Sequence, residues 1–278
     1  MELVVLSLVS MLNLLSCFYV WQFLRFLRPK YLHLAKLILT FAIMIQSSFI
    51  SFEFFTISNI SNLPSWFSQI VLIEIVGIGC LGLLHWKRLL PVVLLASMLS
   101  ALVLVFVAFY LSSGALVSLP TMWLWVHIVL MIIGEVLFLF SALVSLVYIA
   151  SCRQLRNRES PSWLTSSLSL PKLDEVLGRL MLAGVFSLSF GILLGGFFAE
   201  RFWTGPWWLD AKVLFAHFTW LIYFLIILIR WLKPSWRGQR SAWLASISFF
   251  LVLIVSGAID LAFHTKHDEL KINGASEE

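Results

Sequence analysis

The sequence has few charged residues for its length, and this scarcity excludes most classes of soluble protein. Only 12% of the 278 residues are charged and 61% are hydrophobic, whereas soluble domains carry roughly 25% charged and 45–50% apolar residues. Too few polar side chains remain to cover a surface that faces water. We therefore expect lipid to be the solvent around most of the chain.

Cysteine is also scarce, and Cys17, Cys80 and Cys152 stand alone without a CxxC pair. A disulfide framework and thiol redox chemistry are therefore not expected. The sequence contains no glycine-rich phosphate loop, no HExxH motif and no GxSxG motif. The signatures of common soluble enzymes are therefore missing from this sequence.

The most prominent feature of the chain is a series of long apolar stretches. A transmembrane helix needs about 20 apolar residues, and backbone groups in lipid must find their partners within the protein. We predict transmembrane helices near residues 3–24, 34–56, 67–85, 90–112, 123–150, 177–199, 212–232 and 241–264. The expected fold class is all-α, a polytopic transmembrane helix bundle of about eight spans.

The basic residues predict the orientation of these spans. Most of the 19 lie in segments 25–36, 87–88, 153–179 and 230–240, which the spans place on one side of the membrane. Lys and Arg are enriched in cytoplasmic loops, so we expect both termini outside. The predicted location is the inner (cytoplasmic) membrane, with a multi-pass topology. The net charge of +5 then reflects topology and does not indicate nucleic-acid binding.

Informative residues are distributed unevenly along the chain. We expect one integral membrane domain, residues 1–278, with a four-span front part at 1–119, a core at 120–265 and a polar outer tail at 266–278. The front part is mostly aliphatic and aromatic. Glycines in the sixth span indicate close helix packing: Gly184, Gly191, Gly195 and Gly196.

The predicted outer loop ERFWTGPWWLDAK contains the first candidate site. Trp203, Trp207 and Trp208 lie there beside Asp210 and Lys212. An aromatic belt at the membrane–water interface is the simpler interpretation, because Trp is enriched there. The glycine and proline of this loop favour instead a shaped surface, which suits a flat hydrophobic ligand that carries carboxylates.

Two histidines are predicted at the depth of this loop. His127 lies in the outer turn of the fifth span and His264 at the outer end of the eighth, one helical turn after Asp260. Two neutral imidazoles from different helices can supply both axial positions of a haem iron. Ordinary interfacial histidines are the alternative interpretation, and His267 is a substitute for His264. The cofactor expected here is a non-covalent, b-type haem.

Three ionisable residues, Glu74, Glu135 and His217, lie within predicted spans. A charged group there costs about 2.5–3.5 kcal/mol on insertion scales, so each needs a partner, water or protonation. We expect Glu135 either to line a cavity below His127 or to be a protonated carboxyl in helix packing. His217 is expected to bond to a neighbouring helix.

The core resembles the CcsA/HemX-type cytochrome c assembly family, whose hallmark is a tryptophan-rich WWD segment. FWTGPWWLDAKV is similar to the family's W-G-x-Y-W-x-W-D-P-K-E stretch. LDEVLGRLMLAGVFSLSFGILLGG resembles the lead-in to that stretch, and TWLIYFLIILIRWLKPSWRGQRSAW resembles the span that follows it. The departures are Leu209 for a tryptophan, Ala211 for the proline, Val213 for the glutamate, and Leu228 for a histidine of haem-delivering members.

The resemblance implies a haem-handling protein in cytochrome c biogenesis that presents haem at the outer membrane face. Its expected partners are apocytochrome c and a partner membrane subunit of the assembly system. Two histidines would be the axial ligands, the tryptophans would form the face against which the macrocycle rests, and the lysine would pair with a propionate. The expected haem-contacting residues are His127, His264, Trp203, Trp207, Trp208, Asp210 and Lys212.

Two alternatives stay open from the sequence. Leu228, in place of the family histidine, favours the HemX-like branch, a membrane regulator of tetrapyrrole synthesis that would act through the cytoplasmic loop 152–177. A small-solute transporter is the other alternative, and it would need interrupted helices and polar clusters near the midplane.

Overall fold

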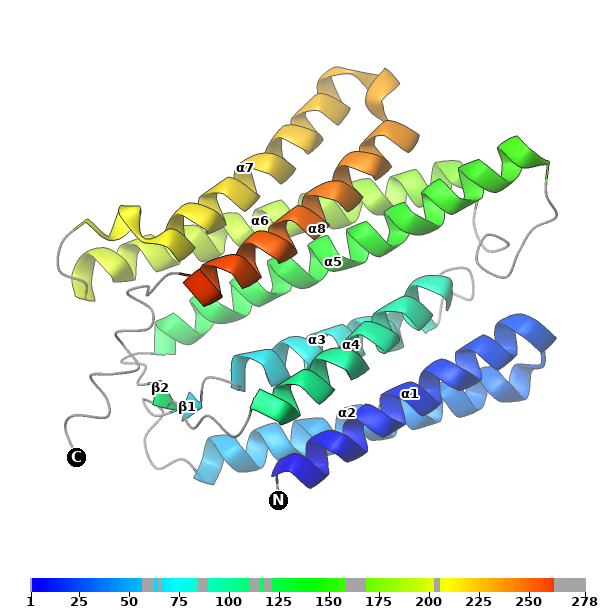
Figure 1. Ribbon diagram of the computed structural model, residues 1–278, viewed down its shortest axis with the longest axis horizontal. Coiled ribbons are helices and arrows are strands. Elements are labelled where there is room, and N and C mark those ends of the chain that lie inside the picture. The colour runs from blue at the N-terminus through cyan, green and yellow to red at the C-terminus, as the bar shows by residue number, and fades with distance from the viewer. Residues whose placement is uncertain are drawn as a thin grey trace. The chain divides into compact units, whose positions relative to one another are not determined.

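The described part of the chain is almost entirely helical (Figure 1). The computed structural model describes residues 2–56, 63–64, 67–84, 90–110, 116–117, 122–158, 169–202 and 206–262. Within these ranges the α-helices are α1 (Glu2–Phe26), α2 (Pro29–Thr56), α3 (Phe67–Leu84), α4 (Leu90–Tyr110), α5 (Met122–Asn157), α6 (Leu170–Phe202), α7 (Ala211–Leu232) and α8 (Gln239–Ala262). The short elements are β1 (Leu63–Pro64), β2 (Leu116–Val117) and the 3-10 turns η3 (Trp207–Leu209) and η4 (Pro234–Trp236).

The helices are long and apolar, as a bilayer requires. Those long and apolar enough to cross it are Val5–Phe26, Pro29–Glu53, Val126–Asn157, Leu170–Arg201, Ala211–Leu232 and Gln239–Ser256. In α3 the apolar stretch Ile70–Leu84 is shorter, and α4 is a 21-residue apolar helix. A helix pairs its backbone groups within itself, which lipid demands of a spanning segment. The predicted all-α, multi-pass membrane bundle is confirmed.

The connection between the fifth and sixth helices is shorter than predicted. The sequence predicts a loop at 152–177, but α5 continues to Asn157 and α6 begins at Leu170. Leu177 is fully buried, and Glu175 forms ion pairs with a lysine and an arginine of its own helix. Hydropathy marks only the part of a helix that lies in lipid, so it misses turns stabilised by packing and by such ion pairs.

The chain divides into two compact units. The front unit comprises Met1–Asn59, Leu63–Ala115 and Arg153–Ser169, and the back unit comprises Ile60–Asn62, Leu116–Cys152 and Leu170–Glu278. Helices α1 to α4 therefore belong to the front unit. Most of α5 and all of α6, α7 and α8 belong to the back unit.

In the front unit, α1 and α3 each pack against both α2 and α4. Polar side chains inside this unit donate to backbone carbonyls of neighbouring helices. The Ser10 hydroxyl donates to the Ala101 carbonyl at 3.2 Å, and the Gln46 amide donates to the Ile70 carbonyl at 2.9 Å. These bonds satisfy polar groups that find no water in lipid, and they hold the four helices together.

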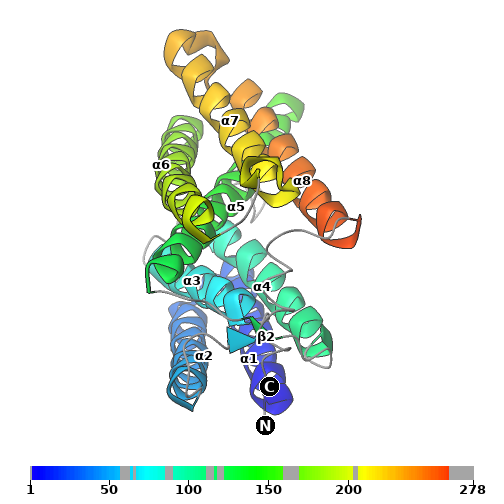
Figure 2. The same cartoon turned by 90° about the vertical axis from the view of Figure 1, so that its left-hand side faces the viewer.

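In the back unit, α7 packs against α6 and α8, and glycines bring α5 close to α6 (Figure 2). A Cβ on Gly184 would lie 2.5 Å from the Phe138 ring, and a Cβ on Gly134 would lie 3.4 Å from the Gly184 carbonyl oxygen. The Phe138 ring stacks on Tyr223 of α7, with ring centroids 3.7 Å apart and an angle of 6°. Small residues thus allow the close helix approach that is typical of membrane bundles.

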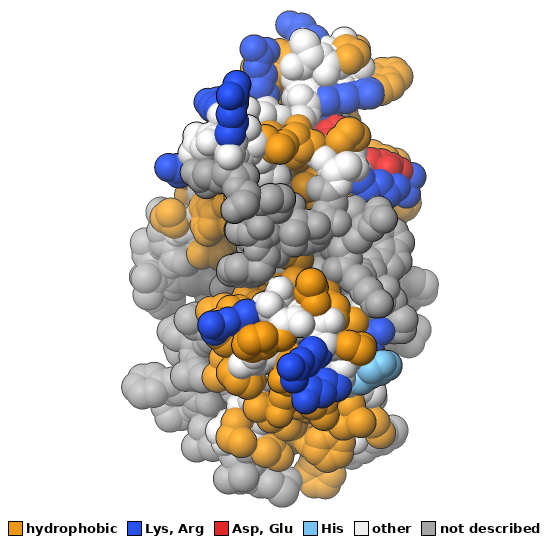
Figure 3. All heavy atoms as spheres, turned by 90° about the vertical axis from the view of Figure 1, so that its right-hand side faces the viewer, with side chains coloured by type: hydrophobic (Ala, Val, Ile, Leu, Met, Phe, Trp, Pro, Cys, Tyr) orange, Lys and Arg blue, Asp and Glu red, His pale blue; other side chains and the backbone are white. Residues whose placement is uncertain are grey.

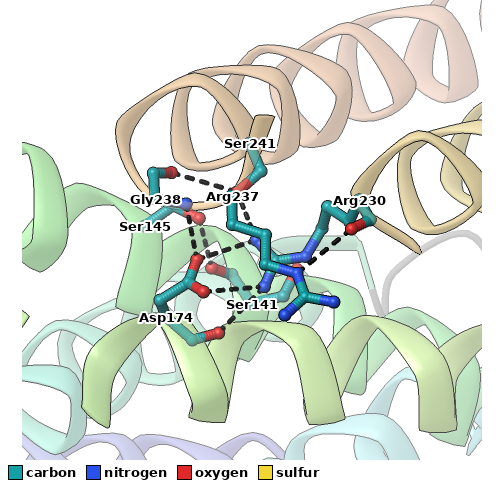
Figure 4. Close-up of polar contacts among 7 residues, drawn as sticks. All are labelled: Ser141, Ser145, Asp174, Arg230, Arg237, Gly238 and Ser241. Carbon is teal, nitrogen blue, oxygen red and sulfur yellow. Dashed lines mark hydrogen bonds and ion pairs between the residues drawn. The ribbon is translucent and has the colours of Figure 1, made fainter. Parts of the chain in front are cut away.

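A largely buried ion pair joins Asp174 of α6 to Arg230 in the last turn of α7, beside the turn that leads to α8 (Figure 4). Arg230 Nη1 donates to Asp174 Oδ1 at 2.8 Å, and Nη2 donates to Oδ2 at 3.1 Å. The Gly238 amide also donates to Asp174 Oδ1 at 2.8 Å, and the Ser241 hydroxyl accepts a hydrogen bond from Arg230. Gly238 has φ +81°, a conformation that favours glycine.

Basic side chains surround this turn. Lys233, Arg237 and Arg240 are exposed, and the space-filling view shows Lys and Arg gathered over the turn from α7 to α8 (Figure 3). Arg240 also lies over the Trp236 ring, 5.7 Å from its centroid. This end of α7 and α8 therefore has the charge that the positive-inside rule associates with the cytoplasm.

Candidate functional site

His127 is the best-positioned of the predicted site residues. It lies near the start of α5 and contacts Gly195 of α6. Gly195 is about 30 Å from Asp174 along the axis of α6, at a rise of 1.5 Å per residue. Its Nδ1 lies 2.7 Å from the carbonyl oxygen of Gly191. A carbonyl oxygen only accepts, so Nδ1 carries the proton, and in a neutral imidazole Nε2 then has the lone pair. This hydrogen bond prepares the ring to ligate a metal through Nε2.

Glycines on α6 make room for the His127 ring. A Cβ on Gly195 would lie 2.5 Å from His127 Cε1 and 2.8 Å from Nδ1. A Cβ on Gly191 would lie 2.7 Å from the sulfur of Met131, one turn further along α5. Packed interiors leave no space for such overlaps, so a larger residue at either position would displace its neighbour. The predicted role of these glycines in close helix contacts is therefore confirmed, with His127 as a partner.

The loop before α7 reaches the same part of α6. Trp207 Cη2 lies 3.2 Å from the position of a Cβ on Gly196. The Trp207 and Trp208 rings form an edge-on pair with centroids 6.0 Å apart and an angle of 76°. Because Gly195 and Gly196 are adjacent, His127 and Trp207 contact neighbouring positions of one helix. Trp208 is 57% exposed, which leaves aromatic surface for a ligand.

Asp210 has a structural role besides the expected contact with haem. Its Oδ1 accepts hydrogen bonds from the backbone N–H groups of Lys212 at 2.9 Å and Val213 at 3.4 Å, and the residue is buried. Asp210 is therefore the N-cap of α7, where a carboxylate also meets the positive end of the helix dipole. An aspartate directly before a long apolar run is a signal from which this cap was predictable.

Asp210→Ala is expected to destabilise the back unit by about 1 kcal/mol, because α7 loses its side-chain cap. Asp210→Ser retains an oxygen that accepts from the same N–H groups. The stability of this variant is therefore expected to lie within roughly 0.5 kcal/mol of the wild type. Thermal unfolding of the purified proteins in detergent compares the two. Equal stabilities of the alanine and serine variants would contradict the capping role.

Two serines of α6, next to the contact with His127, form hydrogen bonds with α5 and α7. The Trp220 indole donates to the Ser189 hydroxyl at 2.7 Å, and the Ser187 hydroxyl donates to the Leu130 carbonyl of α5 at 2.7 Å. The Trp220 ring also stacks on Phe224, with centroids 4.9 Å apart. These serines are not predictable from the sequence, because a single serine in an apolar span has no distinguishing pattern.

Two expectations about residues at membrane depth are corrected. His217 was expected to bond to a neighbouring helix, but its Nδ1 lies 2.8 Å from the Val213 carbonyl of its own helix, and its side chain is exposed. A ring four residues after a carbonyl reaches it without any second helix. Glu135 is also exposed, so the expectation of a carboxyl buried in helix packing is wrong, and its place in a cavity below His127 stays a prediction.

Several predicted site residues lie outside the described residues: Trp203, His264, His267 and the tail 266–278. The helix that leads towards His264, α8, is described up to Ala262. The pairing of His127 with a second axial histidine therefore stays a prediction, as does the place of Trp203 in the aromatic surface.

The comparison with known proteins matches this chain to one family and to several relatives. A family model for the cytochrome C assembly protein matches residues 3–263. The chain is 29% identical over 164 residues to the cytochrome c biogenesis protein CcsA of Prochlorococcus marinus subsp. pastoris, covering 52% of each chain. Identity is 27% over 135 residues to CcsA of Chlamydomonas reinhardtii, covering 49% of this chain and 37% of the relative. The identity to CcsA of Oryza sativa is 36% over 92 residues, covering 33% of this chain and 28% of the relative.

The chain spans about half the length, or less, of these curated relatives. The family match, in contrast, covers nearly the whole chain and includes helices of both units. It therefore extends the resemblance seen in residues 120–265 into the front part. With its multi-pass helical fold, the chain belongs to the cytochrome c assembly protein family and is of the CcsA type.

Proposed function

We propose that this protein binds haem where α5, α6 and the loop before α7 meet, and presents it for cytochrome c assembly. The observation that carries the proposal is the His127 ring, whose Nδ1 is held by the Gly191 carbonyl. The names of the family and of its relatives refer to the assembly of cytochrome c, a protein that contains haem. A ligand for haem iron is what such a protein needs at its binding site.

The chemistry of His127 fits haem iron. Iron binds the deprotonated nitrogen of a neutral imidazole, and a carbonyl on the other nitrogen fixes the tautomer and raises the basicity of the ligand. The close contact with Gly195 leaves the ring little freedom to rotate. His127 is therefore preorganised as a ligand before haem arrives. A histidine ligand binds the iron and needs no covalent bond to the macrocycle, so we propose a non-covalent, b-type haem.

The loop supplies groups for the rest of the haem molecule. Trp207 and Trp208 offer aromatic surface next to the α6 glycines, and Lys212 in the first turn of α7 is suited to a propionate. Asp210 holds this turn in place through its backbone bonds, so we assign it a positioning role. Trp203 and His264 complete the proposed set, with His264 as the second axial ligand. Two imidazoles favour haem holding or electron transfer over oxygen chemistry, because both axial positions are filled.

We place this site at the outer face of the inner membrane. The exposed basic residues of the turn between α7 and α8 favour the cytoplasm for that end of the back unit. His127 and Trp207 contact α6 near its other end, so we place them at the opposite, outer face of the membrane. Apocytochrome c and a partner membrane subunit are the proposed recipients of haem on that side.

Absorption spectra of the purified protein, oxidised and then reduced, test the proposal. The reduced wild type is expected to show the sharp bands of six-coordinate, bis-histidine haem. His127→Ala is expected to lose them, because the iron loses one ligand. His217→Ala is the matched control: it removes an exposed histidine bonded only to its own helix in the described residues, so the spectrum is expected to stay unchanged.

Unchanged haem content in His127→Ala would overturn the assignment of this ligand. A wild-type protein that takes up no haem, even after reconstitution with excess haem, would overturn the proposed function as a whole. That second result would favour the regulatory role in tetrapyrrole synthesis.

A further inference from the structure

The front unit contains a buried acidic side chain that the proposed haem site does not use. Glu74 lies in the middle of α3 and is 8% exposed. The Ser47 hydroxyl of α2 donates a hydrogen bond to Glu74 Oε1. Glu74 Oε2 has no hydrogen-bond partner in the part of the chain that the structure describes. A buried carboxyl oxygen without a partner is uncommon and needs a physical explanation.

No basic side chain of the helices packed against α3 lies at the depth of Glu74. These helices are α2 and α4. In α2 the nearest lysine, Lys36, is about 16 Å along the helix axis from Ser47, at 1.5 Å per residue. All other ionisable residues of the three helices are Lys30, Tyr31, His33 and Glu53 in α2, Cys80 in α3 and Tyr110 in α4. An ionised Glu74 would therefore have no positive partner among them.

We propose that Glu74 and Ser47 form a proton-binding site within the membrane-embedded part of the front unit. An ionised carboxylate without a cation is costly at this depth, whereas a protonated carboxyl is neutral. The Ser47 hydroxyl holds one oxygen, and the proton resides on the other. The ligand of this site is thus a proton, and the site goes beyond the haem-binding function proposed for the back unit.

The site lies at the edge of the pair formed by α2 and α3. Ser47 and its neighbour Ser48 are both exposed on α2, although Glu74 itself is buried. Only Ser47 reaches the carboxyl, because the Ser48 hydroxyl donates to the Met44 carbonyl of its own helix at 2.7 Å. A small apolar reagent dissolved in lipid can therefore approach the carboxyl from the Ser47 side, whereas a charged reagent in water cannot.

Dicyclohexylcarbodiimide, which partitions into lipid, tests this proposal with the full-length protein in membranes. It reacts with a protonated carboxyl: a carboxyl oxygen bonds to the carbodiimide carbon, the carboxyl proton moves to nitrogen, and no group leaves. Mass spectrometry of the α3 peptide is expected to find the adduct on Glu74, and its yield is expected to fall as the pH is raised. A water-soluble carbodiimide is expected to modify Glu175, whose side chain is 40% exposed, and not Glu74.

Ser47→Ala provides a readout that a merely structural carboxyl would not show. A hydroxyl that donates to a carboxyl favours its ionised form, so loss of the hydroxyl favours the proton. At a pH where the wild type is only partly labelled, Ser47→Ala is therefore expected to give a higher yield of the adduct. Ser48→Ala is the matched control, with the wild-type yield expected. Glu74→Gln is expected to abolish the adduct and to retain the haem spectrum.

Failure to label Glu74 at any pH, with Glu175 modified by the water-soluble reagent in the same membranes, would overturn the proposal. A yield of the Glu74 adduct that does not change with pH would also overturn it, because the carboxyl would then not bind and release a proton. Neither result concerns haem, which the spectra of the back-unit variants test separately.

Discussion

Replacing Asp174 by alanine is expected to lower the stability of the back unit by about 3 kcal/mol, the lower end of the range for breaking a buried ion pair. Arg230 has a side chain only 10% exposed, and it donates to both carboxylate oxygens of Asp174. Without Asp174 its charge stays buried and uncompensated. The Gly238 amide loses its acceptor at the same time. The lower end of the range applies because the Asp174 side chain is 19% exposed.

Thermal unfolding of the detergent-solubilised protein measures this loss. The matched control is Glu175→Ala, the next residue along α6, whose carboxylate pairs with Lys172 and Arg179 at an exposed surface. Exposed pairs contribute about 0.2–1 kcal/mol, so the control is expected to change little. Equal losses in the two variants would show that the Asp174 pair does not hold the turn between α7 and α8.

Gly195→Ala is expected to have the second largest effect, a loss of about 1–3 kcal/mol from overpacking. The added Cβ would lie 2.5 Å from His127 Cε1, so the imidazole must leave its place against α6. The hydrogen bond between His127 Nδ1 and the Gly191 carbonyl would then break. Under the proposed function, haem affinity is expected to fall roughly tenfold or more, since about 1.4 kcal/mol corresponds to a factor of ten.

Haem titration followed by absorption, together with thermal unfolding, separates these effects. Gly82→Ala is the control of identical chemistry, because a Cβ on Gly82 has no atom within 4 Å. Its haem affinity is expected to match that of the wild type, and its stability is expected to be unchanged or higher, because alanine favours a helix over glycine. A Cβ on Gly196 would lie 3.2 Å from the Trp207 ring. The loss of stability in Gly196→Ala is therefore expected to be smaller than in Gly195→Ala and larger than in Gly82→Ala. Wild-type haem affinity in Gly195→Ala would contradict the role assigned to the contact between His127 and α6.

Local sequence was sufficient for the fold class and for most of the helices. The scarcity of charge and the long apolar stretches predict transmembrane helices because lipid leaves the backbone no other way to satisfy its polar groups. The ends of helices were less predictable. The loop expected at 152–177 became shorter because α5 and α6 extend past the apolar stretches. The polar turns at the start of α6 are stabilised by burial of Leu177 and by ion pairs, which hydropathy does not detect.

The residue types of the candidate site also came from the sequence: a histidine near the outer end of one helix and a tryptophan-rich loop before another. Their contacts did not. That His127 lies against Gly195, and Trp207 against Gly196, depends on the approach of α5 to α6, which is set by packing along both helices. The same holds for Asp174 and Arg230, which are 56 residues apart in the chain. An apolar pattern determines that helices form in lipid, but only their packing decides which faces meet, because tight side-chain contacts between helices are specific to the folded state.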